Sequence, residues 1–231
     1  MPRGRAAVVA VIGVYNLVQN LWLPRAAYVP ANAAVACGLV ALARRHGCSW
    51  DDLGLDPSKT RDGVKVGLAA ASIATAVAAH ASARPSAYLL DQRAVGSSRD
   101  HLFNAAVRFP LGTAGFEELV FRGVVYATWR RDGGSARSGS LAAATLFGLW
   151  HLIPTARSLA GNPVLSRLGS THSRVAVVVT GAAVTGLASL GFGWLRERSG
   201  SLVAPWLAHA AINSAGYLAG ATAWRRHPDR T

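Results

Sequence analysis

Apolar stretches, each followed by a short polar or arginine-rich segment, make up most of the chain. An apolar stretch of about 20 residues is long enough to cross a bilayer as an α-helix. Seven stretches approach or exceed that length, and Pro, Gly or charged residues end each of them. The pattern predicts an all-α fold, a polytopic transmembrane bundle of about seven or eight helices. The expected helices cover about residues 6–23, 27–43, 64–83, 101–130, 139–153, 174–195 and 202–221.

Two of these stretches contain residues that affect how a helix runs and packs. The fourth stretch is longer than one span needs, and it contains Pro110 and Gly112. Because proline has no N–H to donate, we expect a kink or a split there, with neighbouring helices satisfying the freed backbone groups. In the sixth stretch small residues recur four positions apart, as in Ala182 and Gly186, which lets another helix approach closely.

The chain is expected to form one integral unit, since it shows no internal repeat and no linker. Asn16, Gln19 and Asn20 interrupt the first apolar stretch, and no small-residue cleavage site follows it. That stretch is therefore predicted to be a membrane helix rather than a signal peptide. Residues 1–100 are assigned to N-terminal transmembrane helices and polar loops, residues 101–221 to a helical core and residues 222–231 to a tail. Predicted polar loops cover residues 49–62, 84–100 and 155–173.

Composition agrees with a multi-pass protein of the cell membrane. Hydrophobic residues make up 51% of the chain and charged residues 15%, against about 25% charged in soluble domains. The formal net charge is +13, and most basic residues are arginines that lie between the apolar stretches. We find no nucleic-acid-binding motif, so contact with the lipid bilayer explains the charge better than contact with DNA or RNA. Arginine and lysine divide too evenly between alternate loops to fix the membrane orientation.

Charged residues inside the fourth stretch stand out, because a charge within a membrane costs a few kcal/mol or more unless it is paired. Glu118 and Arg122 are four residues apart, in the order that favours an ion pair on a helix. Glu117 lies about 140° from Arg122 around an α-helix, so it is left without that partner. The spacing assigns Glu118 and Arg122 a structural role and leaves Glu117 available as a general base. The alternative is an interfacial charge cluster, with Glu117 reaching water.

Two later stretches also carry polar residues that apolar packing does not require. Phe147 and His151 share one face of the fifth stretch, and His209 and Asn213 share one face of the seventh. A neutral imidazole at position 151 could share a water molecule with Glu117, and two donors at 209 and 213 could stabilise an oxyanion. Each group could instead be a hydrogen bond between helices. Ionisable groups in a membrane normally face one interior site, which favours a shared hydrolytic centre.

The ordered motifs resemble those of the CPBP family, which comprises CAAX prenyl endopeptidases and Abi-type bacteriocin-processing intramembrane proteases. They are Glu-Glu-x-x-x-Arg at 117–122, Phe-x-x-x-His at 147–151 and His-x-x-x-Asn at 209–213, and the resemblance covers about residues 100 to 220. It implies a CPBP-like catalytic core at 101–221. It further implies that Glu117 activates water beside His151, that His209 and Asn213 stabilise the oxyanion, and that Glu118 and Arg122 hold the site's geometry.

The resemblance leaves metal dependence open. We favour a glutamate-type site without a cofactor, because the chain has no H-E-x-x-H motif and Asn213 suits an oxyanion role better than a ligand role. In the alternative, Glu117, His151 and His209 would bind a divalent metal such as zinc.

The predicted function is that of an intramembrane endopeptidase acting on a peptide or protein substrate. One alternative is a proton-coupled transporter, since membrane-embedded Glu, Arg and His suit a proton relay, although the usual internal repeat is missing. Another is a catalytically inert immunity or chaperone-type membrane protein. The substrate's identity and the oligomeric state stay open.

Overall fold

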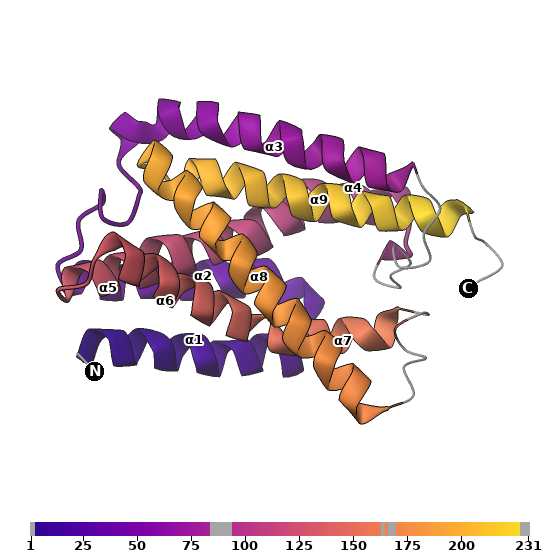
Figure 1. The fold of residues 1–231 in the computed structure, drawn as a ribbon, viewed down its shortest axis with the longest axis horizontal. Helices are drawn as coiled ribbons and strands as arrows, with labels where there is room; N and C mark the ends of the chain where they lie inside the picture. The colour runs from indigo at the N-terminus through magenta and orange to yellow at the C-terminus, as the bar shows by residue number, and fades with distance from the viewer. Residues whose placement is uncertain (1–2, 84–93, 163–164, 166–169, 227–231) are drawn as a thin grey trace.

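A computed structural model describes residues 3–83, 94–162, 165 and 170–226, and in these ranges the chain is helical with no β-strand. Helices lie side by side along the long axis of the molecule, and α8 crosses the others obliquely (Figure 1). The predicted all-α helical bundle is confirmed.

Most expected helices are present, with different ends. Two single turns of 3₁₀ helix, Arg25–Ala27 and Pro57–Lys59, precede α2 and α3. The other helices in chain order are α1 (Arg3–Leu21), α2 (Tyr28–Arg45), α3 (Thr60–Ser82), a composite helix from Ser98 to Arg131, α6 (Ala136–Trp150), α7 (Leu152–Gly161), α8 (Thr171–Ser199) and α9 (Val203–Arg226).

The composite helix, which we call the long helix, carries Glu117. Its consecutive parts are α4 (Ser98–Phe103), η5 (Asn104–Gly115), residues 116–117, η6 (Glu118–Val125) and α5 (Tyr126–Arg131). Both η5 and η6 are π-helical, which means that their hydrogen bonds run from residue i to residue i+5. The predicted split at Pro110 is therefore wrong, because the chain continues through the proline as a wider helix.

Side chains of neighbouring helices satisfy the backbone groups that this irregular stretch leaves free, as predicted. Pro110 has no N–H to offer the carbonyl of Ala105 five residues earlier, and the Ser214 hydroxyl donates to that carbonyl at 2.7 Å. The indole Nε1 of Trp206 donates to the Pro110 carbonyl at 2.7 Å. The Asn32 amide donates to the Gly112 carbonyl at 2.8 Å. These bonds from α2 and α9 keep the long helix continuous.

The predicted ends around Pro154 are wrong. α6 ends at Trp150 rather than near residue 153, and the start of the predicted 155–173 loop belongs to α7. Pro154 lies in the first turn of α7, where a backbone N–H has no helical acceptor, so it is tolerated there. α6 therefore ends before Pro154, and α7 begins with the proline in its first turn. His151 is the residue at the joint between the two helices.

Close contact between α6 and α8 follows from small residues. A Cβ on Gly148 would lie 2.8 Å from the Ala182 carbonyl oxygen, and one on Gly186 would lie 3.3 Å from the Ala144 carbonyl oxygen. The predicted close-approach face around Ala182 and Gly186 is confirmed. α3 and α9 lie side by side in the same direction along the other side of the bundle (Figure 1).

The outer helices show apolar faces outside the molecule. Two helical segments, Pro57–Ser82 and Thr171–Ser199, are long and apolar enough to cross a membrane by length and composition. Their outward side chains include Ile73 and Leu187, each 67% exposed. The buried core lies on the other side, where α1, α2, the long helix and α6 meet.

Candidate active site

Glu117 is a buried carboxylate between the two π-helical segments, and its side chain is 5% exposed. Its Oε1 atom accepts a hydrogen bond of 3.1 Å from the indole Nε1 of Trp150. Its Oε2 atom is buried and has no hydrogen-bond partner among the residues that the structure describes. One oxygen is thus held, and the other faces the interior of the site.

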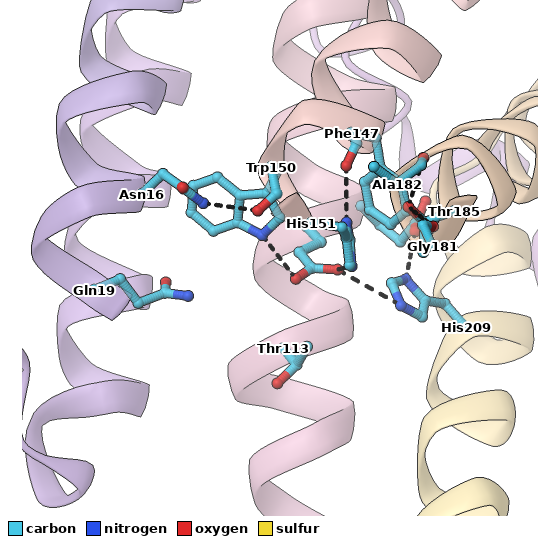
Figure 2. A network of polar contacts seen from close by, with 12 residues as sticks. Asn16, Gln19, Thr113, Phe147, Trp150, His151, Gly181, Ala182, Thr185 and His209 are labelled. Atoms are coloured by element: carbon cyan, nitrogen blue, oxygen red, sulfur yellow. Dashed lines mark hydrogen bonds and ion pairs between the residues drawn. The ribbon is translucent and has the colours of Figure 1, made fainter. Parts of the chain in front are cut away.

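Two imidazoles from different helices face that second oxygen. The Nε2 atoms of His209 and His151 lie 3.6 Å and 4.0 Å from Glu117 Oε2. His151 comes from the joint between α6 and α7, and His209 from α9 (Figure 2). The three side chains are far apart in sequence, and the bundle brings them to one point.

The other ring nitrogen of each histidine is anchored. His151 Nδ1 lies 2.8 Å from the Phe147 carbonyl oxygen, and His209 Nδ1 lies 2.7 Å from Glu118 Oε1. A carbonyl or carboxylate oxygen only accepts, so each Nδ1 is assigned as the donor. In the neutral rings, both Nε2 lone pairs therefore face the Glu117 carboxyl group. Phe147 and His151, paired by their spacing in the sequence, are joined through a backbone carbonyl.

Glu118 and Arg122 form the ion pair that their spacing predicts. Arg122 Nη1 donates to Glu118 Oε1 at 3.1 Å, and both side chains are 1% exposed. The rings of Phe147 and Phe192 lie 4.2 Å and 5.0 Å from the guanidinium carbon, within cation–π range. Glu118 therefore links Arg122 to His209. The Glu118–Arg122 ion pair fixes the face of the site on which His209 lies.

Asn213 lies one helical turn after His209 on α9 and is half-buried. Four-residue spacing places the two side chains on one face of that helix. No hydrogen bond of the Asn213 side chain is found in the described part of the chain. The structure brings Glu117, His151 and His209 together, whereas no hydrogen bond or ion pair among the described residues joins Asn213 to them.

Sequence reasoning missed two polar residues of the site, Trp150 and Asn16. Trp150 lies next to His151 and is 3% exposed, and a buried indole N–H normally finds an acceptor. Asn16, which interrupts the first apolar stretch, donates to the Trp150 carbonyl oxygen at 3.0 Å (Figure 2). A search for hydrogen-bonding residues inside apolar stretches would have flagged both, although not their partners.

The donor set also bears on the metal alternative. Anchored Nδ1 atoms with Nε2 facing inward are usual for metal-binding histidines. As the side chains stand, the described residues include no group of three or more His, Cys, Asp or Glu arranged to hold a metal ion. The distances of 3.6 Å and 4.0 Å from Glu117 Oε2 to the two Nε2 atoms are nevertheless within the roughly 4 Å that can separate two ligands of one zinc ion.

Comparison with protein-family models matches residues 100–215, half of the chain, to the model described as type II CAAX prenyl endopeptidase Rce1-like. No curated protein and no solved structure gives a match. The matched range contains Glu117, His151, His209 and Asn213. It agrees with the family resemblance of the three motifs. The chain therefore belongs to the type II CAAX prenyl endopeptidase Rce1-like family of membrane proteases.

Proposed function

We propose that this CAAX-protease-type peptidase is an intramembrane endopeptidase in which Glu117 activates the attacking water. The observation that carries the proposal is the buried Glu117 Oε2 atom, which has two imidazole Nε2 atoms at 3.6 Å and 4.0 Å and no hydrogen-bond partner in the described ranges. Glu118 and Arg122 also have buried atoms without a partner among the described residues, so the two imidazoles that face Glu117 Oε2 are what favour catalysis at this atom.

The separation between Glu117 Oε2 and His151 Nε2 suits a shared water molecule. At 4.0 Å the two atoms are too far apart for a direct hydrogen bond, and one water can bridge them. That water would donate one proton to each atom and direct its lone pair at a carbonyl carbon. Glu117 then removes one proton while the oxygen forms the new bond to carbon.

Charge balance supports proton transfer at this point. Two buried carboxylates and one buried guanidinium leave one negative charge uncompensated when both histidines are neutral. Burying an unpaired charge is costly, which favours one additional proton shared among Glu117, His151 and His209. A site that holds one mobile proton can accept another from water and later donate one to the leaving amine.

His209 and Asn213 are assigned to the oxyanion. As the carbon–oxygen bond forms, the carbonyl oxygen gains negative charge, which two converging donors would stabilise. A protonated His209 donates through Nε2 while its Nδ1 stays bound to Glu118, whose charge stabilises the imidazolium. Collapse of the tetrahedral intermediate breaks the carbon–nitrogen bond, and the amine takes the proton held at the site.

The site is proposed to lie within the bilayer of a multi-pass membrane protein. A peptide or protein segment would reach it, with no cofactor and no nucleic acid involved. The apolar outer faces of α3 and α8 and the burial of Glu117 support this placement. Excluding bulk water strengthens the electrostatic interactions that the oxyanion requires.

The test is peptide hydrolysis by purified protein in detergent micelles. We expect turnover of a fluorogenic peptide library by the wild type and a loss of about 100-fold or more in Glu117→Gln. Glu197→Gln is the matched control, because Glu197 is an exposed glutamate at the end of α8. Undiminished turnover in Glu117→Gln would overturn the proposal. Inhibition by EDTA, reversed by zinc, would replace the metal-free site with a metal site.

A further inference from the structure

Asn16 on α1 lies outside the range matched to the family and nevertheless reaches the site. It is 8% exposed, and its side-chain amide donates to the Trp150 carbonyl oxygen at 3.0 Å. The two residues are 134 positions apart in the sequence. An asparagine in an apolar membrane helix is costly unless it binds a specific partner.

The Trp150 carbonyl is free to accept because of Pro154. In a continuous α-helix that carbonyl would accept from the N–H of residue 154, and proline has none. The Asn16 amide takes the place of that missing donor. It thereby fixes the last residue of α6 at the joint where His151 follows.

The side chain of the same tryptophan holds Glu117. Its indole Nε1 donates to Glu117 Oε1 at 3.1 Å. The indole ring is packed by Phe116 and Phe121, with ring centroids 5.5 Å and 5.9 Å away. The backbone and the side chain of Trp150 are thus both held in place, so the indole N–H points in one direction, toward Glu117.

We propose that Asn16 and Trp150 are positioning residues that hold the Glu117 carboxylate, which makes α1 part of the catalytic machinery. The catalytic consequence rests on the proposed function of Glu117. With Oε1 occupied by the indole, Oε2 is turned toward His151 and His209. Without the indole N–H, the carboxylate can rotate about its last bond, and Oε1 loses its buried donor.

Trp150→Phe removes the donor and keeps an aromatic ring. The free energy lost with one hydrogen bond to a charged group corresponds to a change in rate of about ten-fold or more. We therefore expect kcat to fall by about ten-fold or more, with KM changed by no more than about two-fold. Trp206→Phe is the matched control, since its indole also donates to the long helix, but to the Pro110 carbonyl. It is expected to retain wild-type kcat per folded protein.

Asn16→Leu tests the hydrogen bond from Asn16 to the Trp150 carbonyl, and Asn20→Leu is its control. Asn20 Nδ2 donates within α1, to the Asn16 carbonyl, rather than to Trp150. Asn16→Leu is expected to lower kcat by about three- to ten-fold and Asn20→Leu to leave it unchanged. Because both residues act through one carboxylate, the Asn16→Leu/Trp150→Phe double variant should be no slower than about Trp150→Phe alone.

A spectroscopic measurement separates this proposal from the proposed function. The indole ¹H–¹⁵N resonance of Trp150, assigned by its loss in Trp150→Phe, should shift in Glu117→Gln and in Asn16→Leu but not in Asn20→Leu. Such shifts without peptide hydrolysis would support the linkage and overturn only the proposed function. An unmoved resonance, or multiplicative losses of kcat in the double variant, would overturn the positioning role even if the protein cleaves peptides.

Discussion

At the scale of single residues, the Glu118–Arg122 pair is the most deeply buried charge pair described at the site. Removing one partner of a buried pair leaves the other charge uncompensated. We expect Arg122→Met to lower the free energy of unfolding by about 3 to 5 kcal/mol. Arg198→Met, at an exposed arginine, is the control. Denaturant unfolding of the purified variants in micelles measures both.

A change near zero in the unfolding free energy of Arg122→Met would show that His209 alone compensates the charge of Glu118. That result would contradict the structural role assigned to the guanidinium. Activity adds a second reading, because His209 depends on Glu118 for its orientation. A stable Arg122→Met variant with full turnover would show that Arg122 is needed neither for stability nor for catalysis.

This ion pair was predictable from sequence because its partners are one helical turn apart. The hydrogen bonds of Glu117 were not predictable, since Trp150 is 33 residues away and belongs to another helix. Spacing along one helix specifies which groups can meet within it, and it carries no information about contacts between helices. The motif residues could be named, but not the atoms through which they interact.

At the scale of helices, the π-helical segment η5 depends on side chains from α2 and α9. Ser214 supplies the hydrogen bond that Pro110 cannot give to the Ala105 carbonyl. Ser214→Ala is therefore expected to cost about 1 kcal/mol of unfolding free energy. In a Pro110→Ala background the restored N–H can serve that carbonyl, so the same change should cost less.

The two Ser214→Ala values form a double-mutant cycle, measured by unfolding in micelles. Equal costs in both backgrounds would show that the serine does not compensate for the proline. In that case the continuity of the long helix would need another cause.

The α6–α8 contact provides a second test at this scale. A methyl group at Gly148 would lie 2.8 Å from the Ala182 carbonyl oxygen, so Gly148→Ala must push the helices apart. Overpacking of this kind costs about 1 to 3 kcal/mol. We also expect reduced turnover, because His151 lies one turn further along the chain.

Gly191→Ala on α8 is the matched control, because a Cβ there meets nothing within 4 Å. It should be neutral or stabilise the helix by up to about 1 kcal/mol. Thermal unfolding in micelles compares the two. A Gly148→Ala variant as stable and active as Gly191→Ala would contradict the close approach of α6 and α8.

The apolar pattern predicted most of the helical segments, and two of the errors occur at prolines. Pro110 was expected to kink or split a helix, and Pro154 was expected to end one. The donors that satisfy the freed carbonyls, Ser214 at Ala105 and Asn16 at Trp150, could not be predicted, and neither could the continuation of the helix through Pro110 and its end before Pro154. That information lies in the packing between helices and is not available from the local sequence.

At the scale of the whole molecule, apolar side chains face outward on α3 and α8, and we expect these faces to contact lipid. Ile73 is near the middle of α3 and 67% exposed. For a lipid-facing position, Ile73→Lys is expected to cost about 2.5 to 3.5 kcal/mol of insertion. On a water-facing surface the same change would be nearly neutral.

Leu55→Lys is the control for this prediction, because Leu55 is 37% exposed in the segment before α3. The amount of protein retained in membranes after alkaline extraction is the measurement. Full membrane retention of Ile73→Lys would contradict the placement of α3 in the bilayer. Loss of Leu55→Lys as well would point to general misfolding.

The central claim is that Glu117 activates water for hydrolysis of a peptide bond. The most direct test reconstitutes the wild type and Glu117→Gln with a membrane-anchored peptide in liposomes containing ¹⁸O-water. Mass spectrometry should find a new carboxyl terminus carrying one ¹⁸O with the wild type, formed about 100-fold or more slowly by Glu117→Gln. Equal rates of ¹⁸O incorporation by the two proteins would contradict the account.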